Sequence, residues 1–260
     1  MLHKKNVLIV TGVARSGTTA LAELLNSHEQ LCLGVERFKF QYLIKNNYSS
    51  SLFEKERFFD FREEDTNLRP AVRPHWQGTY ETMAEKWDTA RIIGDKVPDM
   101  TPILGDFIRA NPTYKYIYIL RNIKDVALSW QARAQRVSDS WPVGKDFARA
   151  CESWGEQYTA LLDYLKTHKM RDRMLLLDYD RMFLEHKLTE RALLNFLGLS
   201  ASESMSRVFD EHVAFATTKT LRKLSPEHAE IYNVVDLTAF RTLRKISTKQ
   251  INHFSSLDAL

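Results

Sequence analysis

The chain alternates between short runs of apolar residues and longer segments in which apolar residues recur at helical spacing. The short runs predict strands over residues 6–11, 31–36, 91–98, 114–120 and 173–179. The periodic segments predict helices over residues 17–27, 79–90, 101–112, 123–136, 145–166 and 187–199. Strands that alternate with helices favour an α/β fold, in which a mainly parallel sheet is flanked by helices on both faces.

The remaining segments carry weaker patterns. Residues 200–260 are basic and predicted to be mostly helical, with a loop over residues 219–233. Residues 50–88 are charged and aromatic, and a loop is predicted at residues 68–76. No internal repeat, low-complexity segment or linker interrupts the sequence, so a single domain over residues 1–260 is expected.

Composition and charge narrow the class of protein. A hydrophobic share of 44% and a charged share of 27% are ordinary for a soluble protein, and no apolar run approaches the ~18 residues of a membrane-spanning helix. The basic start is too short for a signal peptide. Cys32 and Cys151 have no metal-ligand spacing, which favours a reduced, cytoplasmic setting and no metal site. The net charge of +4 is mild and suits a small anionic ligand as well as a nucleic acid, of which the first is expected here and a nucleic-acid partner is not.

The first predicted strand runs into a glycine-rich turn and a helix, "VLIVTGVARSGTTALAELL". The outline is that of the phosphate-binding loop G-x-x-x-x-G-K-S/T, but Thr18 stands where the lysine belongs. Backbone N–H groups of such a turn and the helix dipole favour an anion, to which an arginine and hydroxyl groups add donors. The alternative is a tight strand-to-helix turn without a ligand. The predicted anion-binding residues are Arg15, Ser16, Gly17, Thr18 and Thr19.

A second basic group follows the strand at residues 114–120. Arg121 stands at the carboxyl end of this strand, where ligands of open α/β sheets bind. Ser129 and Arg133 are four residues apart on the next helix and share a face, and Asp125 can brace an arginine. These residues predict a phosphate site separate from the first, and the alternative is a solvated basic helix face. Two such sites on neighbouring strands indicate a nucleotide that is phosphorylated at two places.

Five segments, in this order, resemble sulfotransferases that use 3′-phosphoadenosine 5′-phosphosulfate (PAPS): "GVARSGTTALAELLNSH", "GVERF", "GDKVP", "LRNIKDVALSW" and "LLLDYDRMFLEHKLTERALLNFLGL". The resemblance covers roughly residues 6–200 and is closest in style to the tyrosylprotein and the bacterial carbohydrate or small-molecule sulfotransferases. It implies an architecture like that of P-loop nucleoside triphosphatases and PAPS as donor. A sugar hydroxyl, a lipid, a phenol or a peptide tyrosine can each be the acceptor, and the expected cytoplasmic setting favours a carbohydrate or small metabolite. The resemblance also implies a homodimer.

The resemblance assigns roles to particular residues. It implies that the loop from Arg15 to Thr19 binds the 5′-phosphosulfate, and that Arg121, Ser129 and Arg133 bind the 3′-phosphate. Tyr179 resembles a tyrosine near the adenosine. A phosphosulfate has no β,γ-phosphate chain and needs no Mg²⁺, so arginine and backbone donors can replace the missing lysine.

The resemblance also supplies candidate catalytic residues, of which Arg15 is one. Glu36 in "GVERF" matches a catalytic glutamate and is the candidate base, with an ion pair to Arg37 or a nearby lysine as the alternative. Lys96 in "GDKVP" matches a lysine near the bridging oxygen of the donor, with a surface lysine as the alternative. Asp95 stands where a metal-binding aspartate can stand, but no loop lysine accompanies it.

Two further sets of residues stay open at this point. Lys219, Arg222 and Lys223 either close over the nucleotide or lie in a solvated loop. The aromatic residues between positions 38 and 88, and Trp141, either line an acceptor pocket or pack in the core, the latter for most of them.

Two other functions compete with sulfuryl transfer. A nucleotide kinase with a degenerate loop would need Mg²⁺ and ATP, which the missing lysine argues against. A non-catalytic module that binds nucleotides or RNA would need aromatic stacking platforms beside its charges, and the sequence has no such interleaved pattern.

Overall fold

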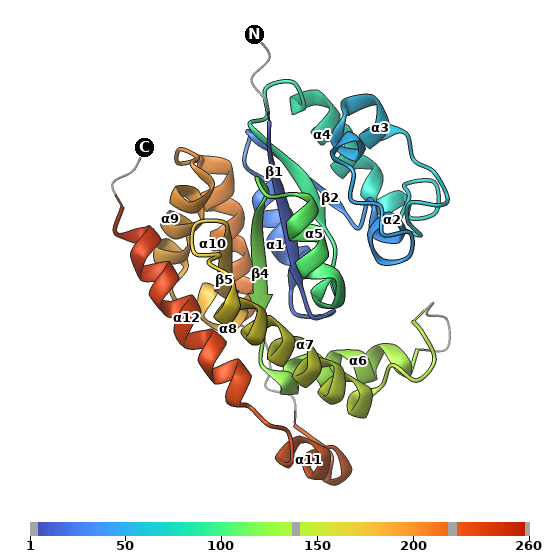
Figure 1. Ribbon diagram of the computed structural model, residues 1–260, viewed down its shortest axis with the longest axis vertical. Coiled ribbons are helices and arrows are strands. Elements are labelled where there is room, and N and C mark those ends of the chain that lie inside the picture. The colour runs from blue at the N-terminus through green and yellow to red at the C-terminus, as the bar shows by residue number, and fades with distance from the viewer. Residues whose placement is uncertain (1–4, 137–140, 218–222, 258–260) are drawn as a thin grey trace.

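The computed structural model describes residues 5–136, 141–217 and 223–257, and of residues 215–217 the backbone alone (Figure 1). Within this part of the chain, a five-stranded sheet has the order β2-β3-β1-β4-β5, and every strand pair is parallel. The strands are β1 (Asn6–Gly12), β2 (Leu31–Val35), β3 (Ile92–Lys96), β4 (Lys115–Leu120) and β5 (Met174–Asp178). The mainly parallel sheet and all five strand positions expected from the sequence are therefore confirmed.

Helices connect the strands and extend the chain beyond β5. They are α1 (Thr18–Asn26), α2 (Lys39–Leu43), α3 (Lys55–Phe59), α4 (Gln77–Lys86), α5 (Leu104–Ala110), α6 (Ile123–Ala134), α7 (Phe147–Thr167), α8 (Tyr179–Met182), α9 (His186–Leu197), α10 (Glu203–Thr217), α11 (Pro226–Asn233) and α12 (Thr238–Ser255). Short 3₁₀ turns lie at Ser50–Phe53, Pro74–Trp76 and Thr101–Ile103.

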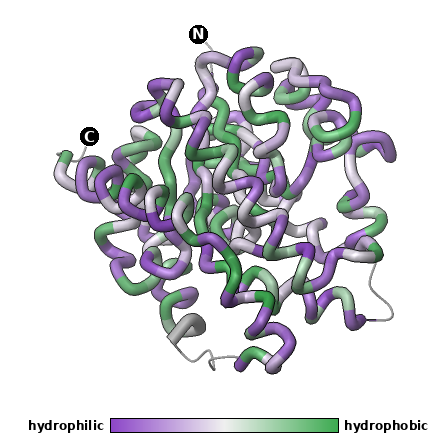
Figure 2. The backbone as a smooth tube through the Cα atoms, turned by 60° about the horizontal axis from the view of Figure 1, so that its bottom comes forward, coloured by the Kyte–Doolittle hydropathy of each residue, from purple (hydrophilic) through white to green (hydrophobic). Residues whose placement is uncertain are grey.

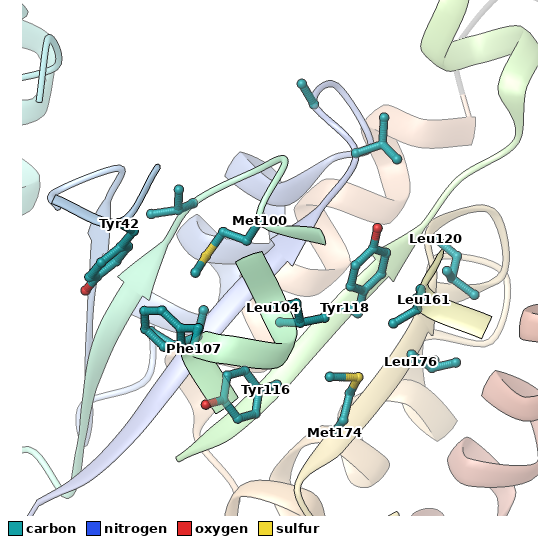
Figure 3. Packing of buried hydrophobic residues seen from close by; sticks show 14 of the residues in the cluster. Tyr42, Met100, Leu104, Phe107, Tyr116, Tyr118, Leu120, Leu161, Met174 and Leu176 are labelled. Carbon is teal, nitrogen blue, oxygen red and sulfur yellow. The ribbon is translucent and has the colours of Figure 1, made fainter. Parts of the chain in front are cut away.

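Successive side chains of each strand point to opposite faces of the sheet. Helices pack on both faces, so the sheet is buried on both sides. On one face Tyr116 and Tyr118 of β4 pack with Leu104 and Phe107 of α5 and with α7 (Figure 3). On the other face α1, α9 and α10 cover a second apolar cluster. In Figure 2 the hydrophobic segments accordingly gather in the middle of the molecule, where the strands lie.

Helix α12 covers the outer edge of β5. Gln250 exchanges two hydrogen bonds with that edge, donating to the Met174 carbonyl at 2.7 Å and accepting the Leu176 N–H at 2.8 Å. The Ser247 hydroxyl donates to the Leu176 carbonyl at 2.7 Å. The helix thus satisfies backbone groups that a bare edge strand would expose.

The expected loop over residues 219–233 is wrong for its second half, which is helix α11. The Ser225 hydroxyl accepts the His228 N–H, and Pro226 occupies the first turn, which is a favourable start for a helix. The His228 ring also stacks on Phe147 of α7, with centroids 4.1 Å apart. A local capping signal was therefore overlooked. Lys219 and Arg222 of the basic stretch lie outside the described residues.

Most of the aromatic residues between positions 38 and 88 pack in the core. Phe58 and Trp87 are buried, with ring centroids 4.7 Å apart, and Phe38 and Phe53 belong to the same cluster. His75 is exposed. The expectation that most of these aromatic side chains pack in the core is confirmed.

Candidate active site

The turn between β1 and α1 presents unsatisfied backbone donors. Arg15 and Gly17 have φ values of 72° and 97°, in the left-handed region that allows the chain to reverse sharply. The first hydrogen bond of the helix joins the Leu21 N–H to the Gly17 carbonyl at 3.1 Å, so the preceding N–H groups have no acceptor within α1. No side chain of the described residues caps this end. The helix dipole and these N–H groups together favour an anion here.

The turn is held from the side of β3 by Asp99, a residue that the sequence argument overlooked. Its Oδ1 accepts the Ala14 N–H at 2.8 Å, and its own N–H donates to the Gly12 carbonyl at 2.9 Å. The indole of Trp130 donates to the Ala14 carbonyl at 2.9 Å. Polar contacts to the residues before Arg15 therefore fix the turn without using the N–H groups at the start of α1.

Arg121 lies at the carboxyl end of β4 and is only 8% exposed. One terminal nitrogen donates to the Arg15 carbonyl at 3.2 Å, and the other pairs with Asp125 at 3.1 Å, the bracing expected from the sequence. Its buried Nε has no hydrogen-bond partner among the described residues. Buried donors are normally satisfied, so an unsatisfied guanidinium nitrogen beside an anion-binding turn fits an anionic ligand.

The two basic groups expected from the sequence adjoin each other. The Arg15 Nε donates to the Ser129 hydroxyl of α6 at 3.0 Å, which links the first turn directly to the second group. The Arg133 guanidinium lies 5.1 Å from the centre of the Trp141 ring. Strands β1 and β4 are neighbours, with Gly12 opposite Ile119, so both groups meet at the carboxyl ends of the strands.

Tyr179 packs between the two groups. Its ring lies 4.2 Å from the Arg121 guanidinium carbon. The ring also leaves no room for a side chain at Gly17, since a Cβ there would lie 2.2 Å from a ring carbon. Burial raises the pKa of the Tyr179 phenol, which outweighs the lowering effect of Arg121. The tyrosine therefore stays neutral near pH 7.

The turn after β2 brings the two other candidates together. The Glu36 carboxylate contacts the Lys96 ammonium at 3.1 Å and the Lys39 ammonium at 2.9 Å. The Lys96 side chain is 2% exposed, so it is not a surface lysine. Burial raises the pKa of Glu36, but attraction to Lys96 and Lys39 outweighs burial and the pKa is lowered overall. Glu36 is therefore a carboxylate at neutral pH and able to accept a proton.

Arg37 contacts other groups than Glu36. Its guanidinium is fully buried and donates to the carbonyls of Phe58 and Asp60, at 2.7 and 2.6 Å, and to the carboxylate of Asp65 at 2.8 Å. Of the two ion pairs that the sequence left as alternatives for Glu36, the described residues form the one with a lysine. Arg37 instead ties the segment around α3 to the end of β2.

Lys145 is a further cation that the sequence argument did not single out. Its ammonium lies 3.7 Å from an Asp99 oxygen and 4.9 Å from the Trp130 ring centre. Trp141, in the same segment, donates to the Lys145 carbonyl at 2.7 Å and is half-buried. This segment therefore borders the anion-binding turn through Asp99.

The described residues contain no group of three or more His, Cys, Asp or Glu side chains placed to hold a metal ion. Both cysteines, Cys32 and Cys151, are buried free thiols. In the same described ranges, the helices are too short or too polar to cross a bilayer.

A parallel α/β sheet with an uncapped helix start after β1 and a buried arginine after β4 is typical of the P-loop-like class. The sequence matches the model of the "Sulfotransferase family" over residues 8–203, which is more than half of the chain. The chain therefore belongs to the sulfotransferase family.

Solved structures show the same fold at low sequence identity. Mouse sulfotransferase SULT7A1 complexed with PAP has 13% identity and a TM-score of 0.54, with 98% of this chain and 90% of that chain covered. Sulfotransferase STF1 from Mycobacterium tuberculosis has 15% identity and a TM-score of 0.52, with 95% and 78% covered. A sulfotransferase from Alicyclobacillus acidocaldarius has 16% identity and a TM-score of 0.50, with 98% and 97% covered. No curated protein matched the sequence.

Proposed function

We propose that this protein transfers a sulfuryl group from PAPS to an acceptor hydroxyl. The observation that carries the proposal is that the uncapped start of α1 and the buried Arg121 lie next to each other and are linked through Arg15. A nucleotide with phosphate groups at both its 5′ and 3′ positions needs two such groups. The complex of a similar fold, mouse SULT7A1, with PAP agrees with this nucleotide.

In this proposal the two ends of the donor bind to different elements. The loop residues Arg15, Ser16, Gly17, Thr18 and Thr19 hold the 5′-phosphosulfate, through N–H groups at the start of α1 and through side-chain donors. Arg121, Ser129 and Arg133 hold the 3′-phosphate, and the Tyr179 ring lies against the adenosine. The unsatisfied Nε of Arg121 supports this assignment, because a phosphate oxygen would satisfy it.

The turn after β2 supplies the proposed chemistry. Glu36 accepts the proton of the acceptor hydroxyl while the acceptor oxygen forms a bond to sulfur. The bond between sulfur and the bridging oxygen breaks, and its electron pair leaves with the 5′-phosphate of the nucleotide. Lys96 donates a hydrogen bond to that bridging oxygen. An ammonium has three N–H donors, so Lys96 can do so and keep its contact with Glu36.

The low pKa of Glu36 limits its strength as a base. A carboxylate paired with two lysines holds a proton less firmly than a free one. We infer that its contribution comes from placement at the acceptor hydroxyl as much as from basicity. General-base catalysis of this kind contributes on the order of 10²–10⁴-fold.

Three further predictions concern the acceptor, the location and the assembly state. A carbohydrate or small-metabolite hydroxyl as acceptor, a cytoplasmic location and a homodimer stay predictions. Sedimentation velocity of the purified chain tests the homodimer.

A thermal-shift panel tests the proposed function. A ligand that binds only the native state raises the melting temperature according to its concentration relative to its Kd. Without added metal, 3′-phosphoadenosine 5′-phosphate should raise the melting temperature more than ATP with Mg²⁺ at equal concentration. A larger shift with ATP and Mg²⁺ would favour a kinase, and no shift with either nucleotide would contradict the proposal.

A further inference from the structure

Asp95 is a buried acidic side chain beside both candidate catalytic residues. It precedes Lys96 in β3 and is 0% exposed. Its Oδ1 accepts the Arg37 N–H at 2.9 Å, and its Oδ2 accepts the Phe38 N–H at 2.8 Å. Both N–H groups belong to the turn that follows Glu36, so one side chain of β3 fixes the backbone that carries the candidate base.

That turn has a backbone conformation that needs support. Glu36 has a φ of 53°, in the left-handed region that is unfavourable for residues other than glycine. Its N–H donates to the Lys96 carbonyl at 2.7 Å. The carbonyl of Lys96 and the carboxylate of Asp95 therefore hold Glu36 on both sides of its strained torsion.

The close approach of the turn to β3 depends on Gly34. Gly34 lies opposite Asp95 in the pairing of β2 with β3. A Cβ at Gly34 would lie 2.8 Å from the Arg37 Cβ and 3.1 Å from the Asp95 Oδ1. A side chain there would push the turn and the carboxylate apart.

The burial of Asp95 carries a free-energy cost. Burial raises the pKa of Asp95 to about 7, against the opposing effects of the two N–H groups, Lys96 and Arg37. A neutral side chain would avoid this cost, but asparagine has one acceptor oxygen in place of two. The two N–H groups of the turn therefore account for an acid at this position.

We propose that Asp95 is a positioning residue, which acts on the reaction through Glu36 by holding the turn that sets the Glu36 carboxylate against Lys96. The inference rests on the proposed function, since it assumes that Glu36 is the base. In this proposal Asp95, which is 0% exposed, does not itself touch the substrate.

A double-mutant cycle tests whether Asp95 acts through Glu36. Asp95→Asn should lower kcat by about 10- to 100-fold, the loss expected when a catalytic group is misplaced by about 1 Å. In the Glu36→Gln background, the same change should lower kcat by less than about 2-fold. The affinity for 3′-phosphoadenosine 5′-phosphate should stay the same throughout. Equal losses in both backgrounds, or no loss in the first, would overturn the inference.

A control and a second variant protect the test against a general loss of structure. Glu190 is a buried carboxylate of α9 that accepts the Ser206 hydroxyl, so Glu190→Gln removes a buried charge elsewhere and should leave kcat unchanged. Gly34→Ala displaces the turn but keeps Asp95 as an aspartate. It should lower kcat as much as Asp95→Asn does. In the Glu36→Gln background it should cause no such loss. A normal kcat in Gly34→Ala would overturn the inference.

Amide hydrogen exchange separates this inference from the proposed function. The Arg37 and Phe38 amides should exchange slowly in the native protein and faster in Asp95→Asn and in Gly34→Ala. Unchanged exchange would show that Asp95 does not hold the turn. A protein without sulfuryl transfer or nucleotide binding would refute the proposed function, whereas the exchange result would still show whether Asp95 fixes the turn.

Discussion

The turns after β1 and β2 use the same backbone conformation for opposite purposes. Each contains a residue other than glycine in the left-handed region, Arg15 in the first and Glu36 in the second. The first turn leaves the N–H groups at the start of α1 without a partner among the described residues. The second has the N–H groups of Glu36 and its two successors bonded to β3.

The difference fits the proposed function, in which the first turn binds the donor and the second carries the base. Free backbone donors suit an anion, and they need only that the chain turns sharply before a helix. A side chain that must meet a reacting atom needs a fixed backbone, which the second turn obtains from a buried acid. Asp99 and Asp95 thus have related roles, because each accepts backbone N–H groups of the turn after a neighbouring strand, one for Asp99 and two for Asp95.

The largest expected effect lies in the second turn. Glu36→Gln removes the proposed base and keeps its size, so kcat should fall by about 10²-fold or more while nucleotide affinity is retained. Initial rates with labelled PAPS and calorimetric titration with the desulfated nucleotide measure the two quantities. An enzyme that keeps its full kcat would remove Glu36 as the base.

The next effect belongs to the first turn. Gly17→Ala places a Cβ against the Tyr179 ring at a φ of 97°, so the turn must distort and the affinity for 3′-phosphoadenosine 5′-phosphate should fall by at least about 10-fold. Gly155→Ala in α7 is the matched control, because nothing lies within 4 Å of a Cβ there. Equal titration curves for the Gly17 variant and the native chain would show that this turn does not bind the nucleotide.

Arg121→Ala distinguishes the two ends of the nucleotide. A hydrogen bond to a charged group contributes about 1.5–3 kcal/mol, so binding of 3′-phosphoadenosine 5′-phosphate should weaken by roughly 10- to 100-fold. Adenosine 5′-phosphosulfate has no 3′-phosphate and should lose much less. Similar losses for the two ligands in competition titrations would mean that Arg121 does not recognise the 3′-phosphate. Arg149→Ala on the exposed side of α7 serves as control, since Arg149 pairs only with neighbouring acids of its helix among the described contacts.

The smallest effect is a difference in the pH dependence of stability. The pKa of Asp95 is raised from 3.8 to about 7, so its contribution to stability is full below pH 3.8 and is lost as the pH rises through 7. The native chain should therefore lose on the order of 2 kcal/mol more than Asp95→Asn between about pH 5.5 and about pH 8. Urea unfolding at the two pH values measures this difference. A parallel pH dependence of the native chain and the Asp95 variant would contradict a raised pKa.

The pH dependence from Glu36 has the opposite sign. Its pKa is lowered, so its contribution to stability is lost only near and below pH 4.5.

Much of the fold follows from local sequence patterns. The five strands are buried apolar runs, which is why "YKYIYIL" and "RMLLLDY" were recognisable without tertiary information. The loop after β1 was recognisable because two glycines at fixed spacing leave a sharp turn before a helix. Helix α11 was missed although Ser225 and Pro226 begin it with an ordinary capping pattern.

The supporting residues of the site could not be derived from local patterns. The pairing of Glu36 with Lys96 depends on the register of β2 and β3, which places Val35 opposite Lys96. The contacts of Asp95 and Asp99 with the two turns depend on the strand order, in which β3 lies between β2 and β1. The sequence does carry one signal, since the motif "GDKVPD" has an acid on each side of its lysine.

The most direct test of the account is a crystal structure of the protein with 3′-phosphoadenosine 5′-phosphate bound. The account predicts that the Arg121 guanidinium contacts the 3′-phosphate and that the backbone of Gly17 to Thr19 contacts the 5′-phosphate. A nucleotide bound elsewhere, or a phosphate at neither of these groups, would contradict it.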